Sequence, residues 1–251
     1  MAGNSREAGR SVLSRAITIL RAFDDDHLRL SLSELSERAG LALSTTHRVA
    51  AELAEHGLLA RSTDGLFHIG LGAFALGVHA PAYAEVRRAA LPYMSELSAE
   101  TGENVQLAVL DGNAVLYLER TVGRRSVPLV SFPGSRLPLH ATGVGKALLA
   151  SQPDDAVRAY LSRPLERFTS HTITAPGSLW REVAAVRERG FAFTKEEMSM
   201  GSFSVAQVLR SRPGGAQLAV GVTVRRIVRT PAAVAARLAR CASDIDQALS
   251  R

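Results

Sequence analysis

Apolar residues in the N-terminal part of the chain recur at three- and four-residue spacing, in stretches separated by polar breaks. One of these stretches, which is the second along the chain, is expected to form a helix that begins at Ser31 and ends at Gly40. Ser31 and Glu34 have the spacing of a capping box, in which the serine hydroxyl accepts from a free helix amide and the glutamate reaches back. The first stretch predicts an amphipathic helix before the acidic run at Asp24, with inward positions Val12, Leu13, Ala16, Ile17, Leu20 and Phe23.

A third helix is expected soon after Gly40, with Ser44 as its N-cap. Two short helices joined by a tight turn that contains glycine form a helix-turn-helix. Residues 58–62 and 66–69 have strand character, and the turn between them predicts a hairpin, which would be the wing of a winged helix-turn-helix. The inward positions of the third helix are expected to be Thr46, Val49, Ala50 and Leu53.

The outward positions of this third helix are candidates for contact with double-stranded DNA. A recognition helix presents its N-terminal turns to the base edges in the major groove. Arg48 is the favoured base or phosphate contact, and Arg61 in the wing is expected to reach the DNA backbone. A capped helix pair with a hairpin also occurs in modules that bind proteins, so a protein partner is the alternative. The full set of candidate DNA-binding residues is Ser44, Thr45, His47, Arg48 and Arg61.

The remainder of the chain predicts an α+β domain with an antiparallel sheet. A helical connector is expected over 73–88, interrupted near Pro81, and the turn at Asp111 and Gly112 joins two strands into a hairpin. The last helix carries an apolar stripe at Val234, Leu238, Cys241, Ile245 and Leu249. Strands are expected near 105–110, 114–119, 127–130, 204–209 and 217–224, and helices near 91–101, 145–151, 154–161 and 178–189.

Composition and charge narrow the class of protein. The formal net charge is +6, but residues 1–80 hold 8 basic and 9 acidic side chains, so bulk charge does not mark the N-terminal part as the DNA-binding one. No apolar run approaches the roughly 20 residues that a bilayer requires, and the start of the chain lacks the apolar stretch of a secretory signal. A single cysteine, Cys241, argues against disulfides. We therefore expect a cytoplasmic protein with no membrane partner.

No constellation of residues indicates catalysis, a metal site or a cofactor. The run from Gly143 to Lys146 resembles part of a phosphate loop, but His140 stands where a Walker motif needs glycine and Ala147 where it needs Ser or Thr. The glycines still allow backbone amides to approach a small anion, or they form a tight loop-to-helix junction without a ligand. Lys146 is either an anion partner or an exposed charge, and the second is favoured. Cys241 is expected to be a small core residue.

Three segments of the sequence resemble motifs of IclR-type transcriptional regulators. The segment from Arg136 to Ala147, RLPLHATGVGKA, is similar to the central signature of their effector domain. The segment 188–192, followed by Glu196, Glu197 and Gly201, is similar to a later family motif, and 43–48 is similar to the family's recognition helix. The resemblance extends from about residue 12 to the C-terminus. It implies a winged helix-turn-helix, a linker helix and a GAF-like effector domain, assembled as a homodimer or homotetramer on operator DNA.

The resemblance also implies the site and the partners. The expected divisions are a flexible tail at 1–10, a winged helix-turn-helix at 11–73, a linker helix at 74–88 and an effector domain at 89–251. Family members sense small organic or aromatic acids, and the motif positions place the effector site at Gly143, Val144, Thr194, Ser204, Gly221 and Thr223. Thr194 stands where some relatives carry an acidic residue, which shifts hydrogen bonding toward Ser204 and Thr223. The function implied is an effector-modulated DNA-binding regulator, and the rivals are a sensor that acts on a protein partner and an enzyme that turns over a small acid.

Overall fold

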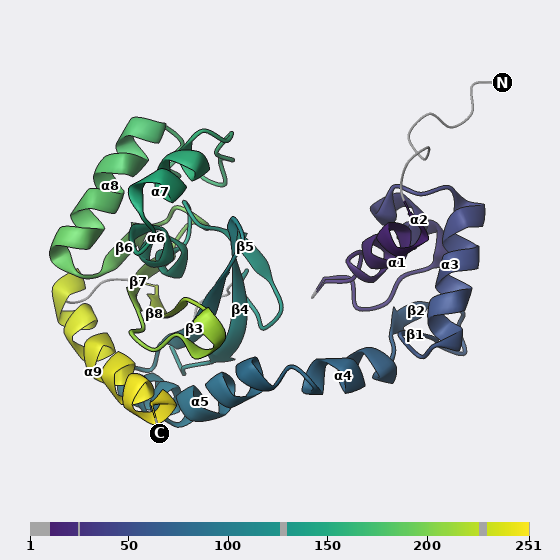
Figure 1. Cartoon of the computed structure of the whole chain (residues 1–251), viewed down its shortest axis with the longest axis horizontal. Helices are drawn as coiled ribbons and strands as arrows, with labels where there is room; N and C mark the ends of the chain where they lie inside the picture. Colours follow the sequence, from purple (N-terminus) through teal and green to yellow (C-terminus); the bar gives the residue numbers. More distant parts are fainter. Residues whose placement is uncertain (1–10, 25, 126–129, 226–229, 251) are drawn as a thin grey trace. The chain divides into compact units, whose positions relative to one another are not determined.

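The computed structural model of the chain describes residues 11–24, 26–125, 130–225 and 230–250 (Figure 1). The chain divides into two compact units, the N-terminal unit Met1–Pro81 and the C-terminal unit Ala82–Arg251. The tail expected at 1–10 and residues 127–129 of one expected strand lie outside the described residues. Within the described ranges, no helix combines the length and the apolar character needed to cross a bilayer.

The N-terminal unit has the expected helix-turn-helix and wing. The capping box of α2 is present: the Ser31 hydroxyl accepts from the Glu34 amide, and the Glu34 carboxylate accepts from the Ser31 amide. A buried cluster that includes Leu35, Val49 and Phe67 holds the helices against the hairpin. The elements are α1 (Val12–Leu20), α2 (Leu32–Ala39), α3 (Leu43–Glu55), β1 (Leu59–Arg61), β2 (Phe67–Ile69) and α4 (Leu71–Val78), with β1 and β2 antiparallel.

The predicted inward face of α1 is partly wrong. Ile19 is fully buried and marks the inward face, whereas Val12, Leu13 and Ile17 are exposed. A stripe of apolar residues at helical spacing indicates that one face is covered, but it does not indicate whether the core of the same unit covers it. The exposed apolar residues of α1 therefore need another explanation.

The connector also differs from its prediction. It begins directly after the wing, because Gly70 is the N-cap of α4. It is interrupted before Pro81 as expected, and α5 (Pro81–Thr101) then continues through Pro92 without a break. Proline at the first position of a helix is well tolerated because its missing N–H has no partner there in any case. The helix expected over 91–101 is thus the second half of a longer one.

The C-terminal unit is built on one antiparallel sheet, as predicted. Its strand order in the described residues is β5-β4-β3-β8-β7-β6. The strands are β3 (Asn104–Asp111), β4 (Ala114–Thr121), β5 (Arg136–Pro138), β6 (Ala192–Lys195), β7 (Phe203–Val208) and β8 (Leu218–Val224). The helices are α6 (Gly143–Ala150), α7 (Asp154–Leu161), α8 (Pro176–Arg189) and α9 (Pro231–Leu249), with a short 3₁₀ turn at Pro213–Gly215. The short strand β5 was not predicted.

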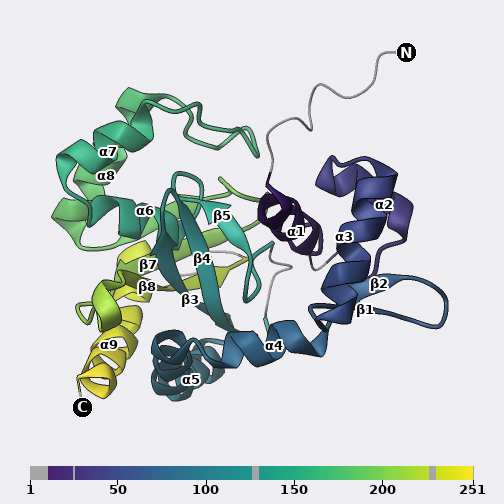
Figure 2. The ribbon, with the colours of Figure 1, turned by 45° about the vertical axis from the view of Figure 1, so that its right-hand side comes forward.

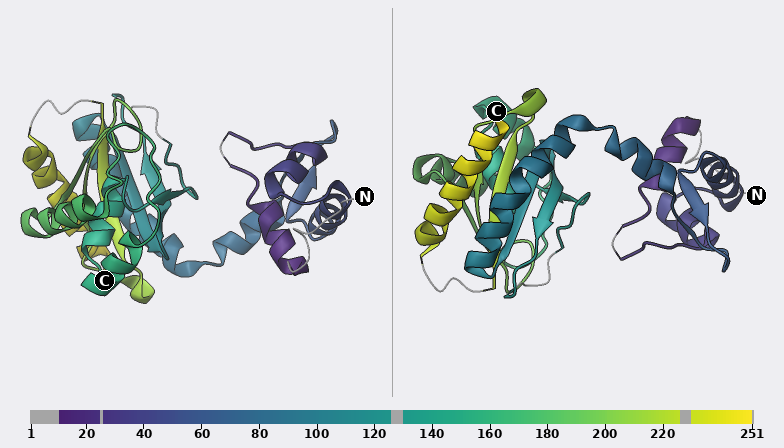
Figure 3. Two further views of the ribbon diagram at one scale, coloured as in Figure 1. Left: turned by 90° about the horizontal axis from the view of Figure 1, so that it is seen from above. Right: turned by 90° about the horizontal axis from the view of Figure 1, so that it is seen from below.

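Helices cover both faces of the sheet (Figure 2). On one face α5 and α9 lie beside each other across the strands, as the view from below shows (Figure 3), and share a core with residues such as Met94, Val222 and Leu238. On the other face α6, α7 and α8 share a second core that includes Leu148 and Val183. Successive strand residues alternate between the two cores, since side chains point to opposite faces. The predicted apolar stripe of α9 is confirmed, with Cys241 buried in the first core.

Candidate functional site

The outward face of α3 carries the predicted DNA-contact residues. Ser44, His47 and Arg48 are exposed and Thr45 is half-buried, whereas the predicted inward positions are all buried. The prediction that Ser44 caps this helix is wrong, because Ala42 occupies the N-cap position. Ser44 lies one residue inside the first turn instead, so α3 presents polar side chains from its first turn onward.

Arg61 in the wing is exposed and also braces the hairpin. Its Nε donates to the Gly65 carbonyl at 3.0 Å, and its guanidinium lies 5.4 Å from the centre of the Phe67 ring. At the tip of the wing, Arg29 pairs with Asp64 at 2.6 Å between Nη2 and Oδ2. The wing thus carries an exposed positive side chain that is oriented by these contacts, and arginine is a common donor to DNA phosphates.

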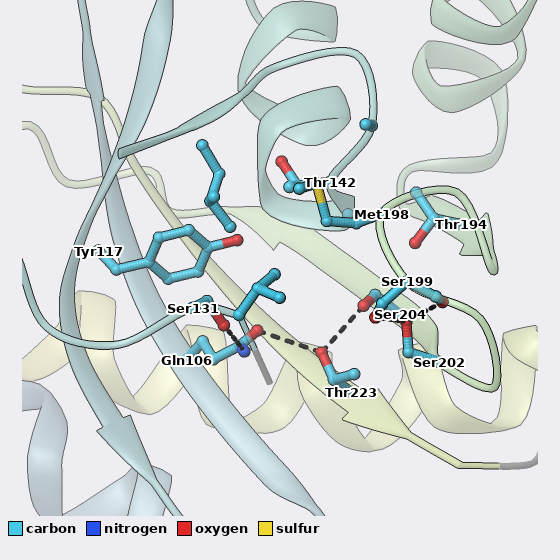
Figure 4. Close-up of a pocket in the computed structure, with 14 residues that line it drawn as sticks. Gln106, Tyr117, Ser131, Thr142, Thr194, Met198, Ser199, Ser202, Ser204 and Thr223 are labelled. Atoms are coloured by element: carbon cyan, nitrogen blue, oxygen red, sulfur yellow. Dashed lines mark hydrogen bonds between the residues drawn. The ribbon is translucent and has the colours of Figure 1, made fainter. Parts of the chain in front are cut away.

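A pocket opens in the C-terminal unit between the start of α6, the sheet and the loop after β6 (Figure 4). The space between its walls measures about 410 Å³, its open mouth included. None of the described residues that line it carries a charged side chain. They are Gln106, Tyr117, Val130, Ser131, Leu137, Ala141, Thr142, Gly143, Thr194, Met198, Ser199, Ser202, Ser204 and Thr223.

A chain of hydrogen bonds runs along the wall of this pocket (Figure 4). The Gln106 amide nitrogen donates to the Ser131 hydroxyl at 2.6 Å, and the Thr223 hydroxyl donates to the Gln106 amide oxygen at 3.2 Å. The Ser204 and Thr223 hydroxyl oxygens lie 2.9 Å apart. Gln106, Ser131 and Thr223 are buried, and buried polar groups are costly unless they are paired. The chain therefore fixes the positions of three hydroxyls and one amide beside the cavity.

Tyr117 and the start of α6 add hydrogen-bond donors. Burial raises the pKa of Tyr117 well above its ordinary value, and interactions with the Thr142 and Ser131 hydroxyls only partly oppose this. The phenol thus stays protonated at neutral pH, and Figure 4 shows it pointing into the pocket. Thr142 caps α6 by accepting from the Gly145 amide at 3.2 Å, and Gly143 follows at the first helical position. The first amides of a helix favour an anion.

The predicted effector residues fall into two groups. Gly143, Thr194, Ser204 and Thr223 line the pocket, and Thr194 lies within β6. Val144 and Gly221 do not line it. The two lie against each other behind the wall, because a Cβ added to Gly221 would lie 2.9 Å from Val144 Cγ1.

Sequence reasoning did not identify Gln106, Tyr117 and Ser131 as lining residues. Gln106 had a visible signal, since it is a polar residue between the apolar neighbours Val105 and Leu107 in the middle of a strand. A polar side chain at such a position is usually buried for a specific partner. The other two became lining residues only through the fold, because Tyr117 comes from β4 and Ser131 from the loop that follows it.

The favoured interpretation of Lys146 as an exposed charge is wrong. Lys146 lies on α6, and its side chain is buried in the protein. Its Nζ lies 2.5 Å from Glu197 Oε1. The partner lies 51 residues away in the chain, so local sequence did not reveal it. Burial raises the pKa of Glu197, and the Lys146 ammonium opposes that shift. Lys146 thus pairs with an anion of its own chain.

His140 is buried beside α6 and is held by hydrogen bonds on both ring nitrogens. Nε2 lies 2.9 Å from the Glu166 carbonyl oxygen, so it carries the proton, and Nδ1 lies 3.0 Å from the Tyr160 hydroxyl. Burial lowers the pKa of His140, the bond to the Glu166 carbonyl opposes this, and the Lys146 charge lowers the pKa further. The imidazole is therefore neutral in the folded protein at neutral pH.

This burial predicts a loss of stability in mild acid. As the pH falls below 6.5 the unfolded chain takes up a proton at this position, and the folded chain does so only at a lower pH, so the free energy of unfolding is expected to fall as the pH falls through 6.5. The slope for one proton is at most about 1.4 kcal/mol per pH unit. Urea unfolding between pH 8 and pH 5.5 measures it. In His140→Gln this part of the slope is expected to vanish, whereas exposed His79→Gln should retain it. An unchanged slope in His140→Gln would contradict the assignment.

The polar groups of the described residues do not assemble into a metal site or an activated thiol. No group of three or more His, Cys, Asp and Glu side chains that could hold a metal ion occurs there. Burial raises the pKa of Cys241 to about 12, so its sulfur remains a thiol and behaves as the small core residue that was predicted.

Comparison with known proteins supports the class that this geometry suggests. Two family profiles match, "IclR helix-turn-helix domain" over residues 12–63 and "Bacterial transcriptional regulator IclR C-terminal" over 79–247. The HTH-type transcriptional regulator BhcR of Paracoccus denitrificans is 34% identical over 223 residues, covering 88% of this chain and 80% of that protein. The HTH-type transcriptional repressor AllR of Escherichia coli is 30% identical, covering 86% of this chain and 81% of that protein.

Among solved structures, the chain is similar to an IclR homolog from Microbacterium hydrocarbonoxydans that was crystallised with 4-hydroxybenzoate. The TM-score is 0.87 at 30% identity, covering 96% of this chain and 99% of that one. A winged helix-turn-helix followed by a ligand-pocket domain defines a DNA-binding regulator that is modulated by a small molecule. The chain belongs to the IclR family of transcriptional regulators, as its motifs predicted.

Proposed function

We propose that this protein reads an operator with the outward face of α3, through Ser44, Thr45, His47 and Arg48, while Arg61 contacts the DNA backbone. The observation that supports this most is the division of α3 into a buried apolar face and an exposed polar face that starts at the first turn. Arginine can donate two hydrogen bonds to guanine, and serine or threonine can donate to bases or phosphates. Glu52 and Glu55 are exposed only farther along the helix, where their charge repels the duplex least.

The pocket of the C-terminal unit is proposed to bind a small organic or aromatic acid. Its lining combines apolar side chains with several hydroxyls and an amide, groups that can orient a small polar ligand. The amides at the start of α6 provide for a carboxylate, and Tyr117, Ser204 and Thr223 provide for a second polar group. 4-Hydroxybenzoate, the ligand in the Microbacterium structure, has both groups. Gly143 would act through its backbone amide and Thr194 through its hydroxyl, whereas Val144 and Gly221, which do not line the pocket, would act by packing against each other behind its wall.

Binding of the acid is proposed to change operator affinity, which is a coupling between two separate sites. The sign of the change decides whether the acid releases or recruits the protein. Such coupling is reciprocal, so operator DNA must alter the affinity for the acid by the same factor. For any acid that changes operator binding, the two factors can be measured separately and should be equal.

The regulator is further proposed to act as a homodimer or homotetramer. The N-terminal unit exposes large apolar side chains on two helices, in addition to its own buried core. Such surfaces usually mark a contact with another protein, and a second copy would double the number of recognition helices on a symmetric operator. These side chains are Val12, Leu13 and Ile17 on α1, and Leu71, Phe74, Leu76 and Val78 on α4.

We do not propose an enzymatic activity. BhcR and AllR are regulators, and no carboxylate, imidazole or thiol stands among the described residues of the pocket. Tyr117 is the titratable side chain among them, and burial keeps its phenol protonated, so it provides a hydrogen-bond donor rather than a general base. Action on a protein partner instead of DNA stays an alternative, and measurements of operator binding decide between the two.

Ser204→Leu is expected to weaken acid binding by about tenfold or more, which equals at least ~1.4 kcal/mol. Ser204 lies directly against Gly143, since a Cβ added there would lie 2.8 Å from Ser204 Cβ. A leucine therefore fills the pocket beside the start of α6 and removes the hydrogen bond to Thr223. Titration calorimetry measures the affinity, and operator binding without acid is expected to persist.

The matched control is Gln207→Leu. It makes the same kind of change on the same strand, outside the pocket lining, and should leave acid affinity unchanged. The titration begins with 4-hydroxybenzoate and continues through other small aromatic and aliphatic acids. Equal affinity of the wild type and Ser204→Leu for an acid that alters operator binding would contradict this placement of the site.

A further inference from the structure

The buried ion pair between Lys146 and Glu197 joins two parts of the pocket that are far apart in the chain. Lys146 lies on α6, three residues after Gly143. Glu197 lies in loop 196–202, which connects β6 to β7 and contributes Met198, Ser199 and Ser202 to the pocket lining. The pair itself does not line the pocket. The pair can therefore act on a ligand only indirectly, through the placement of this loop relative to α6.

Loop 196–202 has an uncommon backbone conformation that is held by several hydrogen bonds. Glu196 has a φ of +54°, a left-handed conformation that costs free energy for a residue with a side chain. Its amide donates to the Ser202 carbonyl at 2.8 Å, and its carboxylate accepts from the Gly201 amide at 2.8 Å. The Thr169 and Thr172 hydroxyls donate to the carbonyls of Glu196 and Glu197, at 2.7 Å each. Only a well-determined set of contacts maintains such a conformation.

The ion pair contributes more to the placement of residue 197 than to the stability of the fold. Two apolar residues of similar size at these positions would be about as stable, because burying two charges costs nearly as much as their attraction returns. A lysine ammonium and a carboxylate must meet at hydrogen-bond distance, however, whereas two apolar side chains can pack in many ways. The pair therefore specifies where residue 197 lies relative to α6.

We propose that Lys146 and Glu197 are positioning residues for the effector pocket: their ion pair holds loop 196–202 at a fixed place relative to α6, and so sets the shape of the cavity. The proposal deepens the proposed effector site and rests on it for the consequence in ligand binding. The consequence for the loop itself does not depend on any ligand.

The test is the double variant Lys146→Met/Glu197→Leu, compared with the wild type and with Asp154→Asn. The double variant removes both buried charges, so it is expected to melt close to the wild type. Asp154→Asn breaks an ion pair with Arg187 in the same unit, away from the pocket. Hydrogen exchange reports the amides of Glu196, Gly201 and Ser202, all of which donate within the loop. We expect their exchange to accelerate about tenfold or more in the double variant while that of β3 and β8 is unchanged.

A double variant that melts like the wild type and keeps the wild-type exchange in loop 196–202 would overturn the proposal. A merely structural pair would change melting and exchange throughout the unit together, and that outcome would also overturn it. If the double variant does not fold, Glu197→Asp provides the same comparison, because it keeps the charge and shortens its reach by one methylene.

Calorimetry with 4-hydroxybenzoate, or with the acid found to act on the operator, then separates the two proposals. Wild-type binding that weakens about tenfold in the double variant supports both of them. A wild type that binds none of the acids overturns the proposed effector site, while hydrogen exchange still decides the role of the pair. Wild-type binding that is equally tight in the double variant overturns the positioning role alone.

Discussion

Replacement of Arg48 by alanine is expected to remove specific operator binding. Arg48 is exposed on the outward face of α3 and is the only arginine on that helix. Loss of a good arginine–base contact costs about 1–3 kcal/mol, and an operator read by two copies of the helix loses it twice. The affinity is therefore expected to fall by about 30-fold to roughly 25,000-fold. A mobility-shift titration of the operator measures it.

The control for Arg48→Ala is Arg181→Ala. Arg181 lies on α8 of the C-terminal unit, and its loss removes the same charge. Operator affinity should change little in this control, because one remote charge alters only the general attraction to DNA. Acid affinity and oligomeric state should match the wild type in both variants. Full operator binding by Arg48→Ala would show that α3 does not read the bases through this residue.

Gly145→Ala is expected to destabilise the C-terminal unit by roughly 3 kcal/mol or more. An added Cβ would lie 2.4 Å from the Thr142 hydroxyl oxygen and 2.6 Å from the Leu139 carbonyl oxygen. The Leu139 atom belongs to the backbone, so no side-chain rotation relieves the clash. The Thr142 contact is also the one that caps α6. A shift of the melting temperature by about 6–12 °C is expected, and acid binding should weaken with it.

Gly177→Ala is the matched control. An added Cβ at Gly177 meets no atom within 4 Å, and the residue lies in the first turn of α8. Alanine there should stabilise the helix by about 0.5–1 kcal/mol at most. The two variants make the same chemical change in the same unit, so opposite shifts of the melting temperature separate steric exclusion from helix propensity. A Gly145→Ala protein that melts like the wild type would show that the loop before α6 is not closely packed.

Local signals explain what the sequence predicted well. The capping box at Ser31, the turn in the wing, and the inward residues of α3 and α9 all depend on neighbours within a few positions. Such features are determined by helix and turn geometry that a single sequence shows directly. For the same reason, the main strands and helices of the C-terminal unit were predicted close to the positions at which they are observed.

The errors at Lys146, α1 and Gln106 share a different cause, which is that the deciding partner is remote in the sequence. The partner of Lys146 is Glu197, on a loop that follows a different strand. The exposed positions of α1 were indistinguishable from core positions, because a stripe does not reveal what covers it. Gln106 became a pocket residue through pairing with Ser131 and Thr223, which come from two other segments. Most of the pocket thus depended on tertiary contacts, whereas motif resemblance located four of its 14 described lining residues, Gly143, Thr194, Ser204 and Thr223.

The measurement that tests the central claim most directly is binding of the purified protein to the DNA upstream of its own gene. A mobility shift at two salt concentrations, with an unrelated duplex as competitor, separates specific binding from general attraction to phosphates. We expect a complex that survives the competitor, is lost in Arg48→Ala, and changes in affinity when an acid that occupies the pocket is added. If no specific complex forms there or with any fragment selected from the whole genome, the protein does not act through DNA, and its proposed role as an operator-binding regulator is contradicted.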